Sequence, residues 1–468
     1  MLDISRNKVP TMTSLKAMVD ELAQWGINHV QLYTEHTFAY PGHEDIWRDA
    51  SPMTREEVIE LDGYCRARGI ELVANQNSLG HLHRWLRHPR YLPLAECPDG
   101  YDTPWGERRS GPFSLNPVDP AALALLADWY DALLPCFSSS LVNVGCDEAF
   151  DLGQGKSRPA CETTGKGRIY LTYLHHVKHL VEARGKTMMF WGDIILNYPE
   201  LIPELERNAI ALVWGYEADH PFDAQCRLFK EAGIPFWVCP GTSTWNSICG
   251  RFDNMIGNLQ AAATAGRAHG AEGFLITEWG DNGHWQTKPF SRLALAAGAF
   301  AAWHGRAPSE TELAELVAPA PLLIALGRVY RMAGFDLPNS SPLFSLIRFQ
   351  NPQAVLDRWS VETLEHASRQ VDAIMANGAD ALASLLPLEA KEIELAARML
   401  GHALRRGRWL KRGQPSSETP ALAADLEGIR KTLAELWLIR NRPGGLDESL
   451  APLDNRLMEY RAVTGQTT

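Results

Sequence analysis

The sequence predicts an α/β protein, a (β/α)8 TIM barrel followed by a C-terminal helical domain. Up to about residue 305, short β-branched or apolar runs alternate with helix-length amphipathic stretches, which is typical of a parallel sheet. Eight such runs can be found, and eight strands close a barrel. Beyond residue 305 the strand signal stops. We therefore expect a barrel over residues 1–305 and a helical domain over residues 306–468.

The predicted strands differ in length but share an apolar or β-branched character. They cover residues 1–5, 28–34, 70–76, 140–145, 187–191, 209–214, 235–239 and 272–277. Between the first two, Leu15, Met18, Val19 and Leu22 recur at helical spacing, and Gly26 predicts the end of that helix. The loop after the third strand, about residues 77–118, is long and rich in Pro, Gly and Trp, which is typical of a functional loop.

The predicted tail is rich in Ala and Leu at helical spacing. Its Pro-, Ser- and Gly-bearing stretch at residues 412–420 is expected to join two helices, because apolar periodicity resumes after it. No internal repeat is evident along the chain.

Charge and cysteine content exclude several classes of partner. The chain has 45 Lys and Arg against 56 Asp and Glu, a net charge of −11, which opposes binding to nucleic acid. No run approaches the ~20 apolar residues of a membrane span, and the N-terminus lacks a secretion signal pattern. The eight cysteines have no CxxC spacing, so free thiols are expected. We predict a cytoplasmic protein without a cofactor, and the sequence leaves a homo-oligomer open.

In a parallel barrel the reacting residues follow the C-terminal ends of the strands, where the loops converge on one mouth. This rule selects Arg6, Glu35, His36, Asn77, His81, Asp147, Glu148, Trp191, Asp193, Trp214, Tyr216, Trp245, Trp279 and Asp281. Four are tryptophans at four successive strand ends, which favours open indole surfaces for a flat ligand such as a sugar ring. For any single tryptophan, packing at the barrel rim is an equal alternative.

The adjacent acids Asp147 and Glu148 follow the fourth predicted strand. Carboxyl groups in this position suit glycoside hydrolysis, in which an acid protonates the departing oxygen. Taken without its position, an Asp-Glu pair is more typical of a solvated helix start. Just past a strand end, the backbone can turn two neighbouring side chains toward one pocket.

The segment NVGCDEAF at residues 143–150 resembles the His-x-Gly-Gly-Asp-Glu signature of glycoside hydrolase family 20, the β-N-acetylhexosaminidases. Asn143 stands in place of His and Cys146 in place of the second Gly, and the form Gly-Cys-Asp-Glu resembles the hexosaminidase D-like branch. The further matches, in order along residues 1–305, are Arg6, Gly80-His81, Trp191, Trp214 and Trp279-Gly280-Asp281.

The resemblance implies an exo-acting enzyme that removes terminal β-linked GlcNAc or GalNAc from a small glycoside or glycan. It implies substrate-assisted catalysis with retention, in which Glu148 is general acid and then base while Asp147 stabilises an oxazolinium ion. Arg6, Asp193 and Asp281 are implied to bind ring hydroxyls, Trp191, Trp214 and Trp279 to surround the acetamido methyl, and His81 to orient the acids. The tyrosine usual after the seventh strand is absent, so Trp245, Asn246 or Tyr216 could bind the acetamido oxygen.

Three alternatives remain at the level of sequence. A strict GalNAc preference is one, since the epimer depends on the direction of one hydroxyl. A metal-dependent hydrolase is another, because His175 and His179 have the i, i+4 spacing of zinc ligands. Their place on a helix outside the barrel disfavours that reading, and we predict no metal site. A non-catalytic sugar-binding barrel is the third, and the presence of both Asp147 and Glu148 disfavours it.

Overall fold

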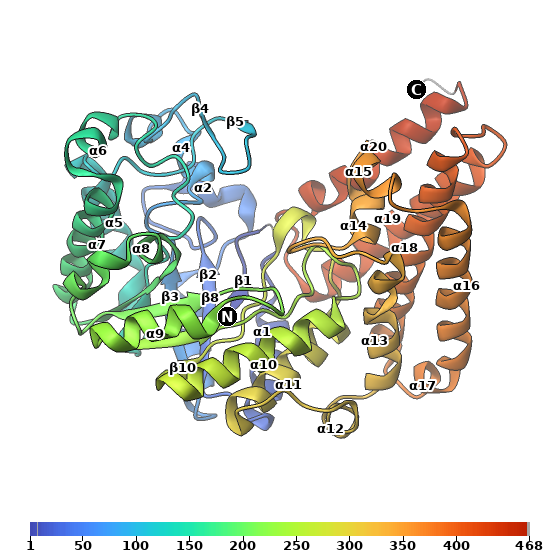
Figure 1. Ribbon diagram of the computed structural model, residues 1–468, viewed down its shortest axis with the longest axis horizontal. Coiled ribbons are helices and arrows are strands. Elements are labelled where there is room, and N and C mark those ends of the chain that lie inside the picture. Colours follow the sequence, from blue (N-terminus) through green and yellow to red (C-terminus); the bar gives the residue numbers. More distant parts are fainter. Residues whose placement is uncertain (7, 466–468) are drawn as a thin grey trace.

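The computed structural model describes residues 1–6 and 8–465, and its centre is a closed parallel barrel (Figure 1). The barrel strands are β1 Leu2–Asp3, β2 His29–Thr34, β3 Glu71–Gln76, β6 Leu141–Asn143, β7 Thr187–Trp191, β8 Ile210–Trp214, β9 Phe236–Cys239 and β10 Gly273–Phe274. They pair in this order, each parallel to the next. The predicted (β/α)8 class with eight strands is confirmed.

The seam of the barrel lies between β10 and β1. The Asp3 amide donates to the Glu278 carbonyl and the Glu278 amide to the Met1 carbonyl, both at 2.9 Å. Here the chain pairs through isolated bridges such as Leu2 with Glu278, rather than through a continuous ladder. The predicted ranges 1–5 and 272–277 are therefore too long as regular strands.

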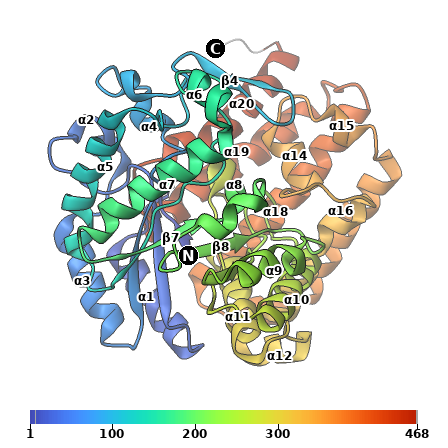
Figure 2. The ribbon, with the colours of Figure 1, turned by 60° about the vertical axis from the view of Figure 1, so that its left-hand side comes forward.

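Helices follow most strands and cover the outside of the barrel. They are α1 Met12–Gln24, α3 Arg55–Arg66, α5 Pro120–Leu133, α7 Lys166–Glu182, α9 Phe222–Ala232, α10 Phe252–His269 and α11 Lys288–His304. Figure 2 shows α5 and α7 along the near side of the barrel. Between β7 and β8 the chain forms only α8 Asp193–Leu196 and the 3-10 helix η4 Pro199–Glu204. The fifth barrel strand is therefore followed by two short helices instead of one long helix.

The loops at the strand ends carry short elements of their own. After β3 come α4 His83–Leu86, η2 Leu92–Leu94 and the hairpin of β4 Gly100–Asp102 with β5 Arg108–Ser110. The other short elements are α2 Glu44–Trp47, η1 Arg48–Ala50, η3 Leu134–Cys136, α6 Arg158–Thr164 and η5 Asp281–Gly283. The long loop predicted at residues 77–118 therefore contains a hairpin that stands over the barrel.

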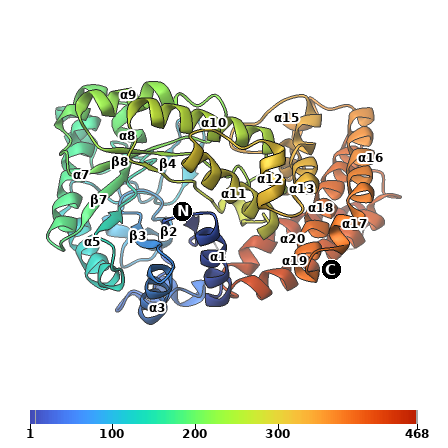
Figure 3. The same ribbon diagram turned by 90° about the horizontal axis from the view of Figure 1, so that it is seen from below.

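The described part of the tail, to residue 465, is helical, as the fold class predicts. Its helices are α12 Glu310–Leu316, α13 Ala320–Gly327, η6 Val329–Ala333, α14 Pro342–Arg348, α15 Gln353–Leu356, α16 Val361–Asn377, α17 Ala379–Ala383, α18 Pro387–Lys411, α19 Thr419–Arg440 and α20 Leu446–Val463. One apolar core runs from Ile248 to Tyr460 and joins the tail to α10 and α11 (Figure 3). Gly305 ends α11 in the left-handed conformation. A domain boundary at residue 305 stays a prediction.

All eight cysteines are free and buried, which confirms the expected free thiols. Within the described ranges, no helix combines the length and apolar character needed to cross a membrane.

Candidate active site

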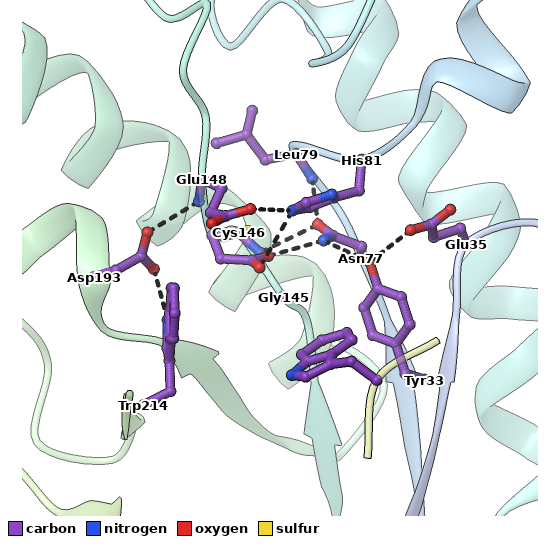
Figure 4. Close-up of polar contacts among 12 residues, drawn as sticks. Tyr33, Glu35, Asn77, Leu79, His81, Gly145, Cys146, Glu148, Asp193 and Trp214 are labelled. Carbon is purple, nitrogen blue, oxygen red and sulfur yellow. Dashed lines mark hydrogen bonds and ion pairs between the residues drawn. The ribbon is translucent and has the colours of Figure 1, made fainter. Parts of the chain in front are cut away.

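The turn after β6 breaks the alternation of the strand. Gly145, Cys146 and Glu148 adopt left-handed backbone conformations, with φ of 69°, 67° and 47°. A Cβ atom on Gly145 would lie 2.7 Å from the side chain of Asn77, so only glycine fits there. Because of this turn, neighbouring acids that would face opposite sides of a strand both approach the ring of His81, which Figure 4 shows beside Glu148.

His81, in the loop after β3, joins the two acids. Its Nε2 lies 3.4 Å from Asp147 Oδ2 and 3.3 Å from Glu148 Oε2 (Figure 4). The preceding Gly80 allows the two loops to meet, since a Cβ atom there would lie 2.8 Å from the Asp147 carbonyl oxygen. The structure thus brings these three predicted residues together at the strand ends.

Arg6 contacts the other nitrogen of the His81 ring. Its Nη2 lies 3.0 Å from His81 Nδ1, its Nε donates to Glu35 Oε1 at 3.0 Å, and its Nη1 donates to Asp281. Tyr33 also donates to Glu35, at 2.9 Å. A guanidinium can only donate, so the contact with Nδ1 is a hydrogen bond when His81 carries its proton on Nε2. That proton faces the two acids.

The charges of the neighbouring acids also favour a proton on His81 Nε2. Burial lowers the pKa of His81, but the charge of Asp147 and the contacts with both acids raise that pKa to about 10. In the imidazolium form, Nδ1 also carries a proton, so two donors would face each other at the contact with Arg6. The neutral form with its proton on Nε2 avoids this clash. Both forms carry a proton on Nε2, so Asp147 and Glu148 face a donor in either case.

Asp147 is held in its charged form. Burial alone would raise the pKa of Asp147, but the charge of His81, the close contact with its ring and the hydrogen bond from Asn77 lower that pKa below its ordinary value. The Asn77 amide donates to Asp147 Oδ1 at 2.9 Å. A buried carboxylate is thus stabilised before any ligand arrives.

Asp193, at the start of α8, supports the turn from the other side. Its Oδ2 accepts from the Glu148 amide at 3.0 Å and its Oδ1 from Trp214 Nε1 at 3.2 Å (Figure 4). Burial raises the pKa of Asp193 to about 8, and the charge of Asp147 adds to that rise. This carboxyl group therefore fixes the backbone after the acid pair and one indole.

The four tryptophans of the mouth pack together more than the sequence suggests. Trp191, Trp245 and Trp279 belong to one buried cluster, against which Trp214 and Tyr216 pack. Trp191 and Trp245 are each 1% exposed and Trp279 is 7% exposed. The expectation of open indole surfaces is wrong for these three, because the rings bury one another, with 6.1 Å between the centroids of Trp191 and Trp279.

The three candidates for the acetamido oxygen differ in their hydrogen bonds. Trp245 Nε1 donates to Asn339 Oδ1 at 2.6 Å, and Asn246 Nδ2 donates to the Asn339 carbonyl at 3.2 Å. The Tyr216 hydroxyl accepts from Trp279 Nε1 at 2.6 Å, which leaves its own proton to be donated. Trp245 has therefore used its only N–H, whereas Tyr216 and Asn246 each keep a proton that could be donated.

Several contacts of the site could not be found from strand ends alone. Tyr33 lies inside β2, and Asn339 comes from the tail, far along the chain. Asn143, at the position of the signature His, donates to Gln31 at 3.0 Å and accepts from the Gly145 amide at 3.0 Å. Asn143 therefore stabilises the backbone of the turn, and these hydrogen bonds go to Gln31 and Gly145 rather than to the two acids.

Among residues 1–6 and 8–465, one group of three side chains has the spacing of metal ligands. It is His81, Asp147 and Glu148, whose ligand atoms lie within 4.8 Å of one another. The guanidinium of Arg6 beside this group opposes a cation there. His179, from the predicted zinc pair on α7, instead lies 3.6 Å from Glu182.

A parallel barrel with neighbouring acids and aromatic side chains at its mouth is the construction of a barrel glycoside hydrolase. Consistent with this class, the profile described as "Glycosyl hydrolase family 20, catalytic domain" matches residues 1–245, just over half of the chain. The chain therefore belongs to glycoside hydrolase family 20, and the resemblance seen in the sequence is confirmed.

Individual relatives agree with this assignment. The chain is 24% identical to Hexosaminidase D of Homo sapiens over 299 residues, which are 58% of this chain and 57% of the relative. It is 23% identical to Hexosaminidase D of Bos taurus over 276 residues, 54% of this chain and 76% of the relative. The chain thus spans little more than half of the human relative. The structure of a Flavobacterium johnsoniae chitobiase superposes with a TM-score of 0.52 at 15% identity, over 93% of this chain and 77% of that one, which supports the fold.

The raised pKa of Asp193 predicts a pH-dependent stability. The folded state keeps the proton up to about pH 8, whereas the unfolded carboxyl loses it near the ordinary aspartate pKa of 3.8. The stabilisation is complete below the unfolded pKa and is lost as pH rises through the folded one. In Asp193→Asn this loss is absent, so the unfolding temperature should fall less from pH 5 to pH 9 than in the wild type, measured by calorimetry. The exposed Asp219→Asn serves as control, and equal pH slopes in wild type and Asp193→Asn would contradict the assignment.

Proposed function

We propose that the chain is an exo-acting β-N-acetylhexosaminidase that hydrolyses terminal β-linked GlcNAc or GalNAc with retention. The observation that carries the proposal is the shared contact of His81 with Asp147 and Glu148, in which Asp147 is held charged beside a second acid. A fixed carboxylate beside a forming cation stabilises the transition state more than the ground state. The names of the human and bovine relatives support a hexosaminidase.

The reaction uses the acetamido group of the substrate as nucleophile. Glu148 gives its proton to the glycosidic oxygen while the acetamido carbonyl oxygen attacks the anomeric carbon, so the leaving alcohol departs and an oxazolinium ion forms. Asp147 accepts the acetamido N–H and balances the positive charge. Glu148 then removes a proton from water, whose oxygen attacks the anomeric carbon. This attack opens the oxazolinium ring, restores the acetamido group and gives overall retention.

Tyr216 is the proposed donor to the acetamido carbonyl oxygen. Its hydroxyl is oriented by Trp279 Nε1. The half-buried Trp214 and the edge of Trp279 are proposed to contact the acetamido methyl, and Trp191 packs behind Trp279. A hydrogen bond that holds this oxygen toward the anomeric carbon lowers the barrier by orienting the nucleophile.

Arg6 and Asp281 are proposed to bind the ring hydroxyls. Arg6 already donates to Asp281 and Glu35, so the hydroxyls would enter a network of matched donors and acceptors. Asp193 holds the Glu148 backbone and keeps acceptor capacity toward a hydroxyl. The substrate is a small glycoside or a terminal glycan, and a strict preference for GalNAc is the alternative within this function.

The eight free thiols favour a reducing compartment, and the cytoplasm belongs to this proposal for that reason. The net charge of −11 disfavours a nucleic-acid partner.

Glu148→Gln tests the proposed acid and base. The amide cannot donate a proton to the leaving oxygen or accept one from water, so kcat toward a chromogenic β-N-acetylhexosaminide should fall about 100- to 10,000-fold. Glu162→Gln, an exposed substitution on α6, should leave kcat unchanged. Full activity of Glu148→Gln would overturn the assignment.

Tyr216→Phe tests the donor to the acetamido oxygen. Removing the hydroxyl while keeping the ring should lower kcat about 100-fold, because the carbonyl oxygen is then no longer held toward the anomeric carbon. Steady-state kinetics should show a smaller change in KM than in kcat. If Trp245→Phe is the more damaging change, the role belongs to Trp245 instead.

Chelation separates the proposal from a metal-dependent hydrolase. Dialysis of the enzyme against a strong chelator should leave the rate unchanged, because the proposed chemistry needs only protein and substrate groups. A loss of activity that added zinc restores would favour the rival mechanism.

A further inference from the structure

A chain of amide side chains crosses the interior of the barrel and ends at the turn after β6. The Gly145 amide donates to Asn143 Oδ1 and Asn143 Nδ2 donates to Gln31 Oε1, both at 3.0 Å. Asn75 Nδ2 donates to the same Gln31 oxygen at 2.9 Å. The three amide side chains are at most 1% exposed, so water does not compete for these bonds. The backbone of the turn is therefore anchored to Gln31 on β2.

The chain continues from Gln31 toward the opposite end of the barrel. Gln31 Nε2 lies 2.9 Å from His29 Nε2 and 3.7 Å from the sulfur of Met189 on β7. His29 is the first residue of β2, whereas the turn follows the last residue of β6, and in a parallel barrel these positions lie at opposite ends. His29 also lines a depression of about 460 Å³, together with Asn28 and with Gly273 at the start of β10. Solvent can therefore reach the end of the chain that carries the imidazole.

The hydrogen bonds of the chain have one direction. An amide nitrogen only donates and an amide oxygen only accepts, so each bond fixes the next one. Because Gln31 Oε1 accepts from Asn75 and Asn143, Gln31 Nε2 faces His29 as a donor. His29 Nε2 must then accept, which requires a neutral imidazole with its proton on Nδ1. Glu71 Oε2, 3.9 Å from Nδ1, favours the proton there. The chain is thus complete only while His29 is neutral.

The surroundings of His29 keep it neutral near pH 7. Burial and the Met1 amino group lower the pKa of His29, Glu71 raises it, and the pKa is lowered from its ordinary value. Burial also lowers the pKa of the Met1 amino group, to about 5. From β9, Trp237 packs edge-on against the imidazole at 4.9 Å between ring centroids and brings no charge. His29 therefore gains its second proton only in mildly acidic solution.

We propose that Gln31 is a positioning residue that links the charge of His29 to the turn carrying Asp147 and Glu148. The inference rests on the proposed function, in which these acids do the chemistry. A neutral His29 holds the chain in its observed direction, and a protonated His29 reverses it. Acid thus loosens the acid pair from the far end of the barrel.

The reversal follows from the donors and acceptors of the chain. A protonated His29 Nε2 would face the Gln31 nitrogen, so the Gln31 amide rotates to present its oxygen. The Gln31 nitrogen then faces Asn75 and Asn143. Asn75 Oδ1 is buried without a hydrogen-bond partner among the described residues, so Asn75 can rotate and accept without losing a bond there. Asn143 can accept only by turning its Oδ1 away from Gly145. The loss therefore falls on the turn after β6.

The pH dependence of kcat toward a chromogenic β-N-acetylhexosaminide tests this link. In His29→Gln, the glutamine oxygen replaces Nε2 as acceptor and does not titrate. The ratio of kcat at pH 7 to kcat at pH 5 should therefore be about 5- to 10-fold smaller than in the wild type, the range of one lost hydrogen bond. The exposed His304→Gln on α11 should keep the wild-type ratio. An unchanged ratio in His29→Gln would overturn the inference.

Gln31→Met tests the positioning role at a single pH. Methionine keeps the length of the side chain but cannot anchor Asn143, so kcat should fall about 10-fold at pH 7. KM should change little, because Arg6 and Asp281, the groups proposed to bind the sugar, lie outside the chain of amides. Full kcat in this variant, or a rise in KM without a fall in kcat, would contradict the positioning role.

A measurement without substrate separates the inference from the proposed function. In NMR spectra of the wild type, the Gly145 amide resonance should titrate together with the His29 imidazole, and in His29→Gln it should lose this transition. A Gly145 resonance that ignores the titration of His29 would overturn the inference. A coupled titration in a protein that fails to hydrolyse the chromogenic substrate would reject the proposed function alone.

Discussion

The contact of His81 Nε2 with both Asp147 and Glu148 is the interaction on which the site depends. It needs the left-handed turn at Gly145, which points two neighbouring acids into one pocket, and the bare backbone of Gly80, which lets the loops meet. It gives the acids a common donor, so a buried carboxylate can stay charged beside a second acid. The order of the barrel strands places β3 next to β6 and makes this contact local.

The helical tail contacts the loops of the barrel mouth directly. Asn339 fixes the indole of Trp245, and the Trp285 indole donates to the Ser449 carbonyl at 2.8 Å, which ties the loop after β10 to α20. The bond to Asn339 satisfies the N–H of a buried indole, which would be costly to leave unpaired. The same docking places Arg348, at the end of α14, in a pocket beside the mouth.

Strand periodicity and the rule of barrel strand ends predicted the eight strands and located Arg6, His81, Asp147 and Glu148 at one mouth, because both depend on local pattern. Other features depend on long-range packing that no local pattern encodes. The burial of Trp191 against Trp279, the engagement of Trp245 by Asn339 and the approach of Arg348 follow from how loops and tail dock. The seam strands were predicted too long because isolated bridges replace a ladder there.

In the proposed mechanism, a charged Asp147 stabilises a cyclised, positively charged form of the acetamido group. The most direct measurement is the dissociation constant of a thiazoline analogue of that form, compared with the free N-acetylhexosamine, in the wild type and in Asp147→Asn. We expect the analogue to bind the wild type at least about 100-fold more tightly than the free sugar, and to lose most of this advantage in the variant. A thiazoline that binds the wild type no better than the free sugar would contradict the mechanism.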